Sequence, residues 1–224
     1  MKKGVFIVIA GTDGSGKTVQ TKKLVENLKN VGKDVETIEF PQYGNKSAAL
    51  VEEYLTGKYG SADEVGPYRA SIFYACDRYA ASFKIRKWLD EGKIVIANRY
   101  VSANMGHQAG KIKDTAERDK FLAWLEDLEF NIFGIPRPNL NILLFVPPEI
   151  GQKLVDKKGH REYIGGKKRD IHEADLEHLK NAADAYMYVA KKYSWLIIDC
   201  APNNELREIE DISKEVFEKV KEKI

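Results

Sequence analysis

The chain has 224 residues, a length typical of one compact domain, and we treat residues 1–224 as a single unit. A composition of 43% hydrophobic and 31% charged residues excludes a disordered, collagen-like or disulfide-scaffold chain. The formal net charge of +2 is too small for a general attraction to nucleic acid or anionic lipid, and no apolar run reaches the roughly 18 residues of a membrane span. Cys76 and Cys200 lie far apart without metal-ligand spacing. We therefore expect free thiols, a cytoplasmic location, and neither nucleic acid nor membrane as a partner.

Short apolar runs alternate along the chain with longer amphipathic stretches, which is typical of a parallel sheet covered by helices on both faces. The apolar runs predict five strands, over residues 5–10, 34–40, 94–97, 140–146 and 195–199. The stretches between them predict helices over residues 17–30, 47–56, 68–91, 116–130, 148–157, 173–192 and 204–221. The predicted fold class is therefore α/β, with a five-stranded parallel sheet.

The first predicted strand leads into a glycine-rich segment that matches the phosphate-binding pattern G-x-x-x-x-G-K-[ST] and opens a helix. The segment consists of Gly11, Thr12, Asp13, Gly14, Ser15, Gly16, Lys17 and Thr18. Glycines let successive backbone N–H groups converge on phosphate oxygens at a helix N-terminus, where the helix dipole is positive. Lys17 is expected to reach the β- and γ-phosphates, and Thr18 to place its hydroxyl on Mg²⁺. The pattern predicts a P-loop NTPase fold that binds ATP or GTP; a strand-to-helix turn without ligand is the alternative.

Position 14 is glycine, so the loop itself carries no arginine that reaches the transferring phosphoryl group. Supplied arginine charge is worth about 10³ to 10⁵ in the rate of phosphoryl transfer. Residues 153–169 contain seven Lys or Arg residues against two acidic ones. We expect this segment to be a mobile basic lid, with Arg161 and Arg169 as catalytic arginines. Taken by itself, such a charged run is more often a solvated surface excursion.

The long predicted helix over residues 68–91 carries two kinds of side chain at helical spacing. Its apolar residues predict a core-facing stripe. The stripe consists of Ile72, Cys76, Tyr79, Ala80 and Phe83. Tyr74 and Arg78 lie one turn apart and nearly opposite this stripe, so an aromatic ring and a guanidinium are expected to face the same space. The pair suits a nucleobase and a phosphate, although an exposed tyrosine and a solvated arginine would show the same spacing.

Further candidate residues follow the second and third predicted strands, at the sheet edge where α/β proteins bind ligands. Arg99 comes directly after the third strand and is a second candidate for holding phosphate. Asn104 and Gln108 share a helical face if the chain winds there, and they would offer amide groups to a pyrimidine edge. A polar surface turn explains these two residues equally well, and Phe40 before Pro41 is also compatible with an ordinary loop.

Together these motifs resemble the thymidylate kinases, a family of nucleoside monophosphate kinases, over nearly the whole chain. The resemblance implies a five-stranded parallel sheet with helices on both sides, a homodimer, and Mg²⁺-dependent transfer of the γ-phosphoryl group of ATP to dTMP. It implies that Asp13 contacts the deoxyribose 3′-hydroxyl and that Tyr74 stacks on thymine. Phe40 would pack beside the base, and Asn104 and Gln108 would read its edge.

The same resemblance implies roles for charged residues and for the lid. Arg78 and Arg99 would bind the acceptor phosphate, and Tyr163 would lie near the 2′ position of the sugar, where its ring disfavours ribose. Glycine in the P-loop combined with a basic lid is similar to the subgroup whose lid provides the catalytic arginine. This agrees with the expectation for Arg161 and Arg169 from charge alone.

The sequence departs from the family pattern at two positions. The third strand of the family ends in Asp-Arg-Tyr, and here Asn98 replaces the aspartate. An amide oxygen still accepts a hydrogen bond from a Mg²⁺-bound water but supplies no negative charge, so we retain Asn98 among the catalytic positions. Tyr43 stands where many members carry a phosphate-binding arginine. We expect an active enzyme, because phosphoryl transfer depends on positioning and distributed charge.

Two other functions remain compatible with the motifs. One is a kinase for another deoxynucleotide or for a deoxynucleoside, since aromatic stacking tolerates different bases. Two arginines favour an acceptor that already carries phosphate, and Asn98 cannot take a proton from a nucleoside hydroxyl. The other is a regulator that binds ATP without turnover, which Asn98 and Tyr43 would suit.

Overall fold

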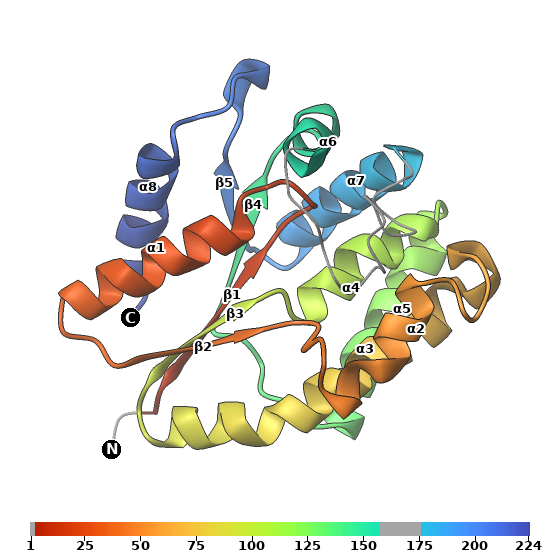
Figure 1. Cartoon of the computed structure of the whole chain (residues 1–224), viewed down its shortest axis with the longest axis horizontal. Helices are drawn as coiled ribbons and strands as arrows, with labels where there is room; N and C mark the ends of the chain where they lie inside the picture. The colour runs from red at the N-terminus through yellow and green to blue at the C-terminus, as the bar shows by residue number, and fades with distance from the viewer. Residues whose placement is uncertain (1–2, 157–175) are drawn as a thin grey trace.

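The computed structural model describes residues 3–156 and 176–224 (Figure 1). Five parallel strands form one sheet in the order β2-β3-β1-β4-β5, which confirms the predicted fold class. The strands are β1 (Val5–Ala10), β2 (Val35–Glu39), β3 (Ile94–Asn98), β4 (Leu140–Phe145) and β5 (Leu196–Asp199). Each begins and ends within one residue of its predicted bounds. The central strands β3, β1 and β4 are marked clearly by apolar runs that are largely buried.

Eight α-helices connect and cover these strands in the described ranges of the chain. They are α1 (Lys17–Asn30), α2 (Ala49–Leu55), α3 (Ala62–Asp90), α4 (Val101–His107), α5 (Thr115–Glu126), α6 (Pro148–Asp156), α7 (Leu176–Lys192) and α8 (Ile209–Lys221). Shorter helical turns occur at η1 (Lys46–Ala48), η2 (Ala109–Lys111) and η5 (Pro202–Asn204), and η3 (Asp127–Ile132) is a π-helical turn. None of the helices described combines the length and apolar character required to cross a bilayer.

The sheet is the middle layer of three. Alternate residues of β1 point to opposite faces, so Ile7 and Ile9 pack against α1 and α8, while Phe6 and Val8 face the side covered by α3, α4, α5 and α7 (Figure 1). All four side chains are fully buried. Both faces of β1 therefore need apolar residues, which explains its unbroken hydrophobic run.

Several helix bounds differ from the predictions for local reasons. α3 begins earlier, at a capping box formed by Ser61 and Glu64, and is interrupted at Gly66, whose φ of 73° is not helical. The predicted helix over residues 116–130 divides into α5 and the π-helical turn η3. The predicted helix over residues 204–221 begins only at Ile209, and residues 153–156 of the predicted lid belong to α6.

The predicted core stripe of α3 is wrong. Phe83 is 59% exposed, Tyr79 43% and Ile72 39%, while the opposite face, which includes Asp77 and Arg78, is buried. A hydrophobic pattern indicates one covered face only when the covering surface is itself apolar. Here the covering surface includes polar active-site groups, so α3 turns polar side chains inward and leaves its apolar stripe at the surface of this chain.

Candidate active site

A cavity of about 800 Å³ opens at the carboxyl ends of the central strands, within the range typical of small-molecule sites. One wall is the loop after β1 and the start of α1. The other wall comes from the ends of β2 and β3 and from α3 and α4. Residues of both walls include Asp13, Lys17, Thr18, Glu39, Phe40, Tyr74, Arg78, Asn98, Arg99, Asn104 and Gln108. The cavity therefore joins both groups of residues that the motifs singled out.

The loop between β1 and α1 has the backbone that its glycines predict. Gly11 and Gly14 have φ angles of 146° and 81°, which disfavour any residue with a Cβ atom. A Cβ atom at Gly14 would also lie 2.1 Å from the carbonyl oxygen of Gly151 in α6. Position 14 therefore has no room for a side chain, and an arginine could not replace this glycine without moving α6.

The lysine and threonine of the motif, Lys17 and Thr18, lie at the start of α1, where the first backbone N–H groups have no partner inside the helix. Lys17 Nζ donates to the carbonyl oxygen of Thr12 at 2.6 Å and lies 3.5 Å from Ser15 Oγ. Its ammonium group thus lies over the loop, at the position where phosphate oxygens are expected.

The ends of β2 and β3 place further oxygen atoms beside this loop. Asn98 Nδ2 donates to Thr18 Oγ1 at 3.2 Å and to Glu39 Oε1 at 2.6 Å. A hydroxyl, an amide and a carboxylate oxygen form a hard donor set of the kind that suits Mg²⁺. In residues 3–156 and 176–224, no group of three or more His, Cys, Asp or Glu residues could hold a metal ion by itself. A cation here would therefore need ligands from nucleotide phosphates and water.

Asp13 and Arg99 form an ion pair between the phosphate loop and the end of β3. Burial by itself raises the pKa of Asp13, but Arg99 and then Lys17 outweigh it and hold the pKa well below its ordinary value of 3.8. Arg99 has a positive φ of 66°, uncommon for a residue with a side chain. Its Nη1 also lies 3.4 Å from His107 Nε2. Burial lowers the pKa of His107 to about 3, so its imidazole is neutral at pH 7.

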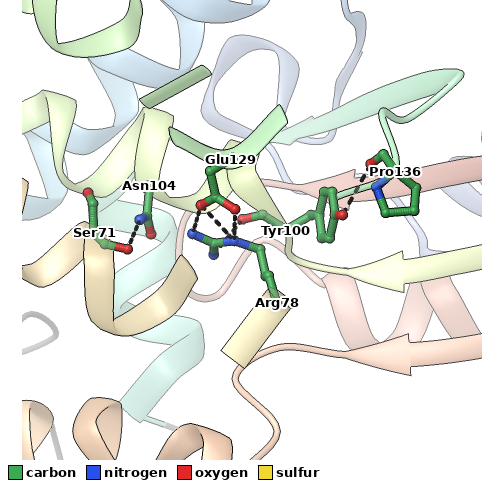
Figure 2. Close-up of polar contacts among 6 residues, drawn as sticks. All are labelled: Ser71, Arg78, Tyr100, Asn104, Glu129 and Pro136. Atoms are coloured by element: carbon green, nitrogen blue, oxygen red, sulfur yellow. Dashed lines mark hydrogen bonds and ion pairs between the residues drawn. The ribbon is translucent and has the colours of Figure 1, made fainter. Parts of the chain in front are cut away.

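Arg78 forms a second ion pair at the far side of the cavity (Figure 2). Its Nε lies 3.0 and 3.1 Å from the two carboxylate oxygens of Glu129, and its Nη2 also donates to that carboxylate. Nη1 lies 3.4 Å from the carbonyl oxygen of Tyr100. Neither partner's side chain is more than 2% exposed. The guanidinium is thus held in one orientation while it borders the cavity, and Tyr74, one turn earlier, lines the same space, as the helical spacing predicted.

Aromatic and amide side chains complete this side. Phe40 is 4% exposed, and its ring centroid lies 5.6 Å from that of Tyr100. Asn104 lies in α4, Gln108 follows the last residue of that helix, and both line the cavity. The chain after Tyr100 is therefore helical. Asn104 Nδ2 donates to the carbonyl oxygen of Ser71 at 3.3 Å (Figure 2). Gln108 Oε1 is buried and has no hydrogen-bond partner within the described parts of the chain.

Three predicted site residues, Arg161, Tyr163 and Arg169, lie outside the described residues. The segment that leads to them begins in α6, where Leu154 lines the cavity.

The structure also brings residues to the cavity that sequence reasoning missed. Glu39 had no motif to mark it, and Glu129 lies in a π-helical turn far along the chain. Leu206 and Arg207, in the segment between β5 and α8, also line the cavity. His107, three residues after Asn104, also lines the cavity. Only its spacing from Asn104 could have suggested that it borders the cavity.

Comparisons with known proteins agree on one family. A family model described as "Thymidylate kinase" matches residues 9–212. A protein named "Thymidylate kinase" from Mycobacterium tuberculosis is 31% identical over 199 residues, which covers 87% of this chain and 91% of that protein. A "Probable thymidylate kinase" from Thermococcus gammatolerans is 28% identical over 225 residues, with coverage of 99% and 98%.

A solved structure has the same fold. It is described as "Structure of Thymidylate Kinase from Candida albicans Reveals Origin of Broad Substrate Specificity and a Novel Structural Element" and matches with a TM-score of 0.74 at 19% identity. The match covers 98% of this chain and 92% of the other. At this identity, the likeness supports the arrangement of strands and helices.

Proposed function

The chain belongs to the thymidylate kinase family, and we propose that its cavity binds ATP at the loop of residues 11–18 and dTMP at the wall formed by Tyr74, Arg78 and Arg99. The protein is an ATP-dependent dTMP kinase. One observation supports this assignment of the ATP and dTMP sites: the phosphate loop and the wall of Tyr74, Arg78 and Arg99 line the same cavity. An oxygen of the dTMP phosphate attacks the γ-phosphorus of ATP, the bond to the β-phosphate oxygen breaks, and dTDP and ADP result.

At the donor end, the backbone N–H groups of residues 11–18 hold the phosphates, and Lys17 moves from the carbonyl oxygen of Thr12 to the β- and γ-phosphates. The support for this step is the short contact of Lys17 with its own loop, which the negative phosphate oxygens replace. Fixed donors aimed at the transferring group stabilise the charge that spreads over its equatorial oxygens.

At the acceptor end, the two arginines have different roles. The pair of Arg99 with Asp13 is partly open to solvent, with 24% and 11% of the side chains exposed, so the acceptor phosphate can share Arg99. Arg78 is locked by Glu129, which already balances its charge. We therefore assign Arg99 as the main phosphate clamp and Arg78 as a fixed hydrogen-bond donor on the acceptor wall.

The remaining acceptor residues keep their proposed roles around the thymidine. Tyr74 stacks on the base, Phe40 packs beside it, and the amides of Asn104 and Gln108 face its edge. The unpartnered oxygen of Gln108 supports this, because a buried acceptor without a hydrogen bond costs about 1–3 kcal/mol until a ligand donor satisfies it. Asp13, ionised beside Arg99, accepts a hydrogen bond from the 3′-hydroxyl.

The family generally uses Mg-ATP, and the oxygen atoms around Thr18 suit this cation. Thr18 is the proposed protein ligand in the phosphate loop. When bound, Mg²⁺ neutralises charge on the β- and γ-phosphates and helps to hold them in line with the acceptor.

Residues 153–169 are proposed as the basic lid, with Arg161 and Arg169 supplying charge to the transferring phosphoryl group and Tyr163 near the sugar. The closed space at Gly14 supports an arginine from elsewhere, because the phosphate loop has no room for a side chain at that position. The rate effect expected of such an arginine corresponds to roughly 4–7 kcal/mol of barrier.

A second copy of the chain is the proposed partner of the exposed apolar stripe on α3. Ile72, Tyr79 and Phe83 lie on one face over about three turns, and Ile132, which is 67% exposed, follows in η3. Isolated apolar residues are normal on a surface, but a continuous stripe on one helix is typical of an interface. In a symmetric dimer, the same stripe would pack against itself across the twofold axis.

The expected cytoplasmic location remains a prediction.

The acceptor is tested with a coupled ADP-release assay in which Mg-ATP is combined with dTMP, dUMP, dCMP, dGMP or thymidine. We expect the highest kcat/KM with dTMP and no turnover with thymidine, which lacks the phosphate that Arg99 holds. Lys17→Met is the control for background activity. ADP release that is independent of acceptor, or equal rates with thymidine and dTMP, would contradict the assignment.

A further inference from the structure

The ends of β2 and β3 carry a pair of side chains that the phosphate loop alone does not explain. Glu39 and Asn98 are partners in the parallel register of these strands, and both line the cavity. The single amide group of Asn98 donates to Glu39 Oε1 at 2.6 Å and to Thr18 Oγ1 at 3.2 Å. It therefore links a carboxylate on β2 to the hydroxyl expected to hold the cation.

The other atom of this amide has no such partner. Asn98 is 4% exposed, and its Oδ1 makes no hydrogen bond with any described residue. A buried acceptor of this kind is costly until something donates to it. Water bound to a divalent cation is a strong donor, and Mg²⁺ usually keeps several of its waters in protein sites. The orphaned oxygen is therefore an available acceptor for water bound to a cation held at Thr18, whose hydroxyl the same amide contacts through Nδ2.

Charge is the remaining requirement. Position 98 holds an amide, so β3 ends at the cavity without a carboxylate. Glu39 places a carboxylate within one hydrogen bond of that amide, on the neighbouring strand. Glu39 is exposed and lines the cavity, so a cation that arrives with a nucleotide reaches it without any opening of the core.

We propose that Glu39 supplies the carboxylate of the Mg²⁺ site in this protein and that Asn98 is the positioning residue that orients Glu39 and Thr18. The carboxylate of this site comes from β2, and β3 contributes the amide beside it. This inference rests on the proposed binding of Mg-ATP at residues 11–18. It also explains why an amide suits position 98: an aspartate there would lose the donor to Glu39 and place two carboxylates side by side, where like charges repel.

The test uses the full chain saturated with a non-hydrolysable ATP analogue, with Mn²⁺ as a paramagnetic probe whose binding is followed by electron paramagnetic resonance. We expect Glu39→Gln to weaken Mn²⁺ binding to the nucleotide complex by about tenfold or more, equivalent to about 1.4 kcal/mol. Affinity for the analogue in EDTA should stay unchanged. Glu36→Gln is the matched control, since Glu36 lies on the same strand but does not line the cavity. Its carboxylate pairs with Lys93 Nζ at a distance of 3.0 Å.

Exchanging the two side chains gives a sharper result. Asn98→Asp alone should not tighten Mn²⁺ binding, because it sets a carboxylate against Glu39. The Mn²⁺ affinity of the double variant Glu39→Gln/Asn98→Asp should return to within about threefold of that of the parent. This variant again has one carboxylate and one amide donor, with the amide now on β2 and the carboxylate on β3. In turnover assays, Glu39→Gln should raise the Mg²⁺ concentration that gives half-maximal activity, and excess Mg²⁺ should restore much of the rate.

Two outcomes would overturn the inference. One is an unchanged affinity for Mn²⁺ in Glu39→Gln. The other is an increase in Mn²⁺ affinity on Asn98→Asp that is the same in the parent and in the Glu39→Gln background. Failure of the proposed function is a separate result. It would appear as normal cation binding in the parent without phosphorylation of dTMP, whereas failure of this inference would leave phosphorylation intact and the Glu39 variant unaffected.

Discussion

Removal of the Glu129 carboxylate should be one of the most damaging single changes in this protein. Glu129 is fully buried, and Arg78, which it holds through Nε and Nη2, is 1% exposed. Glu129→Ala would leave a guanidinium buried without a counter-charge. Breaking a buried pair in this way costs about 3–5 kcal/mol. For a chain of this length, each kcal/mol lowers Tm by about 2–4 °C, so the expected decrease is about 6–20 °C.

The assay is urea unfolding followed by far-UV circular dichroism, combined with thermal unfolding and the KM for dTMP. Glu117→Ala is the matched control, because Glu117 makes an exposed ion pair with Lys120 and should cost less than about 1 kcal/mol. The double variant Arg78→Met/Glu129→Leu removes both charges and should recover much of the lost stability. It should not recover dTMP affinity, because the donor on the acceptor wall is gone.

These outcomes separate stability from substrate binding. A loss below about 1 kcal/mol in Glu129→Ala would refute the reasoning, since it would mean that Arg78 finds water or another partner as soon as Glu129 is removed. Normal KM for dTMP in the double variant would refute the role assigned to Arg78 while leaving the stability argument untouched.

Three further predictions concern other parts of the molecule. Burial lowers the pKa of His107 to about 3 in the folded chain, against an ordinary 6.5, so below pH 6.5 a proton binds to the unfolded chain first. The free energy of unfolding should therefore fall below pH 6.5, by up to about 1.4 kcal/mol per pH unit from this group. Urea unfolding at pH 7, 6 and 5 should show a shallower decline for His107→Asn than for the parent, and parallel declines would contradict this prediction. Phe83→Glu should convert a dimer to a monomer in sedimentation velocity runs, whereas the exposed control Val31→Glu should not; a parent that sediments as a monomer would rule out the dimer. Replacing Arg161 and Arg169 together by Ala should lower kcat at least a hundredfold with little change in dTMP binding, and unchanged turnover would remove the lid from the mechanism.

The sheet and the phosphate loop could be predicted because their determinants are local. The apolar runs of the five strands and the spacing of residues 11–18 hold all the required information within a few neighbouring residues. Tyr74 and Arg78 were also predictable as a pair that shares one space, since helical spacing alone decides it.

The orientation of α3 could not be predicted in the same way. Its buried face includes Asp77, which accepts hydrogen bonds from Ser47 Oγ at 2.7 Å and from the backbone N–H of Gln42 at 2.8 Å. Such partners come from distant segments and leave no periodic signal. Arg78 is inward for the same reason, because Glu129 lies 51 residues further along the chain.

Glu39 shows the same limit at the proposed cation site. Its position beside Asn98 depends on which strands are neighbours in the sheet and on their register. Without that register, the amide at position 98 looks like the lack of a carboxylate. With it, a carboxylate lies beside the amide on the adjacent strand.

The central claim is that a single cavity holds the two substrates at opposite ends, and calorimetric titration of the parent, Lys17→Met and Tyr74→Ala with dTMP and with a Mg²⁺-bound ATP analogue tests it most directly. We predict that Lys17→Met loses at least tenfold in affinity for the analogue and keeps its affinity for dTMP, while Tyr74→Ala shows the reverse. Loss of affinity for the same ligand in both variants would contradict the division of the cavity.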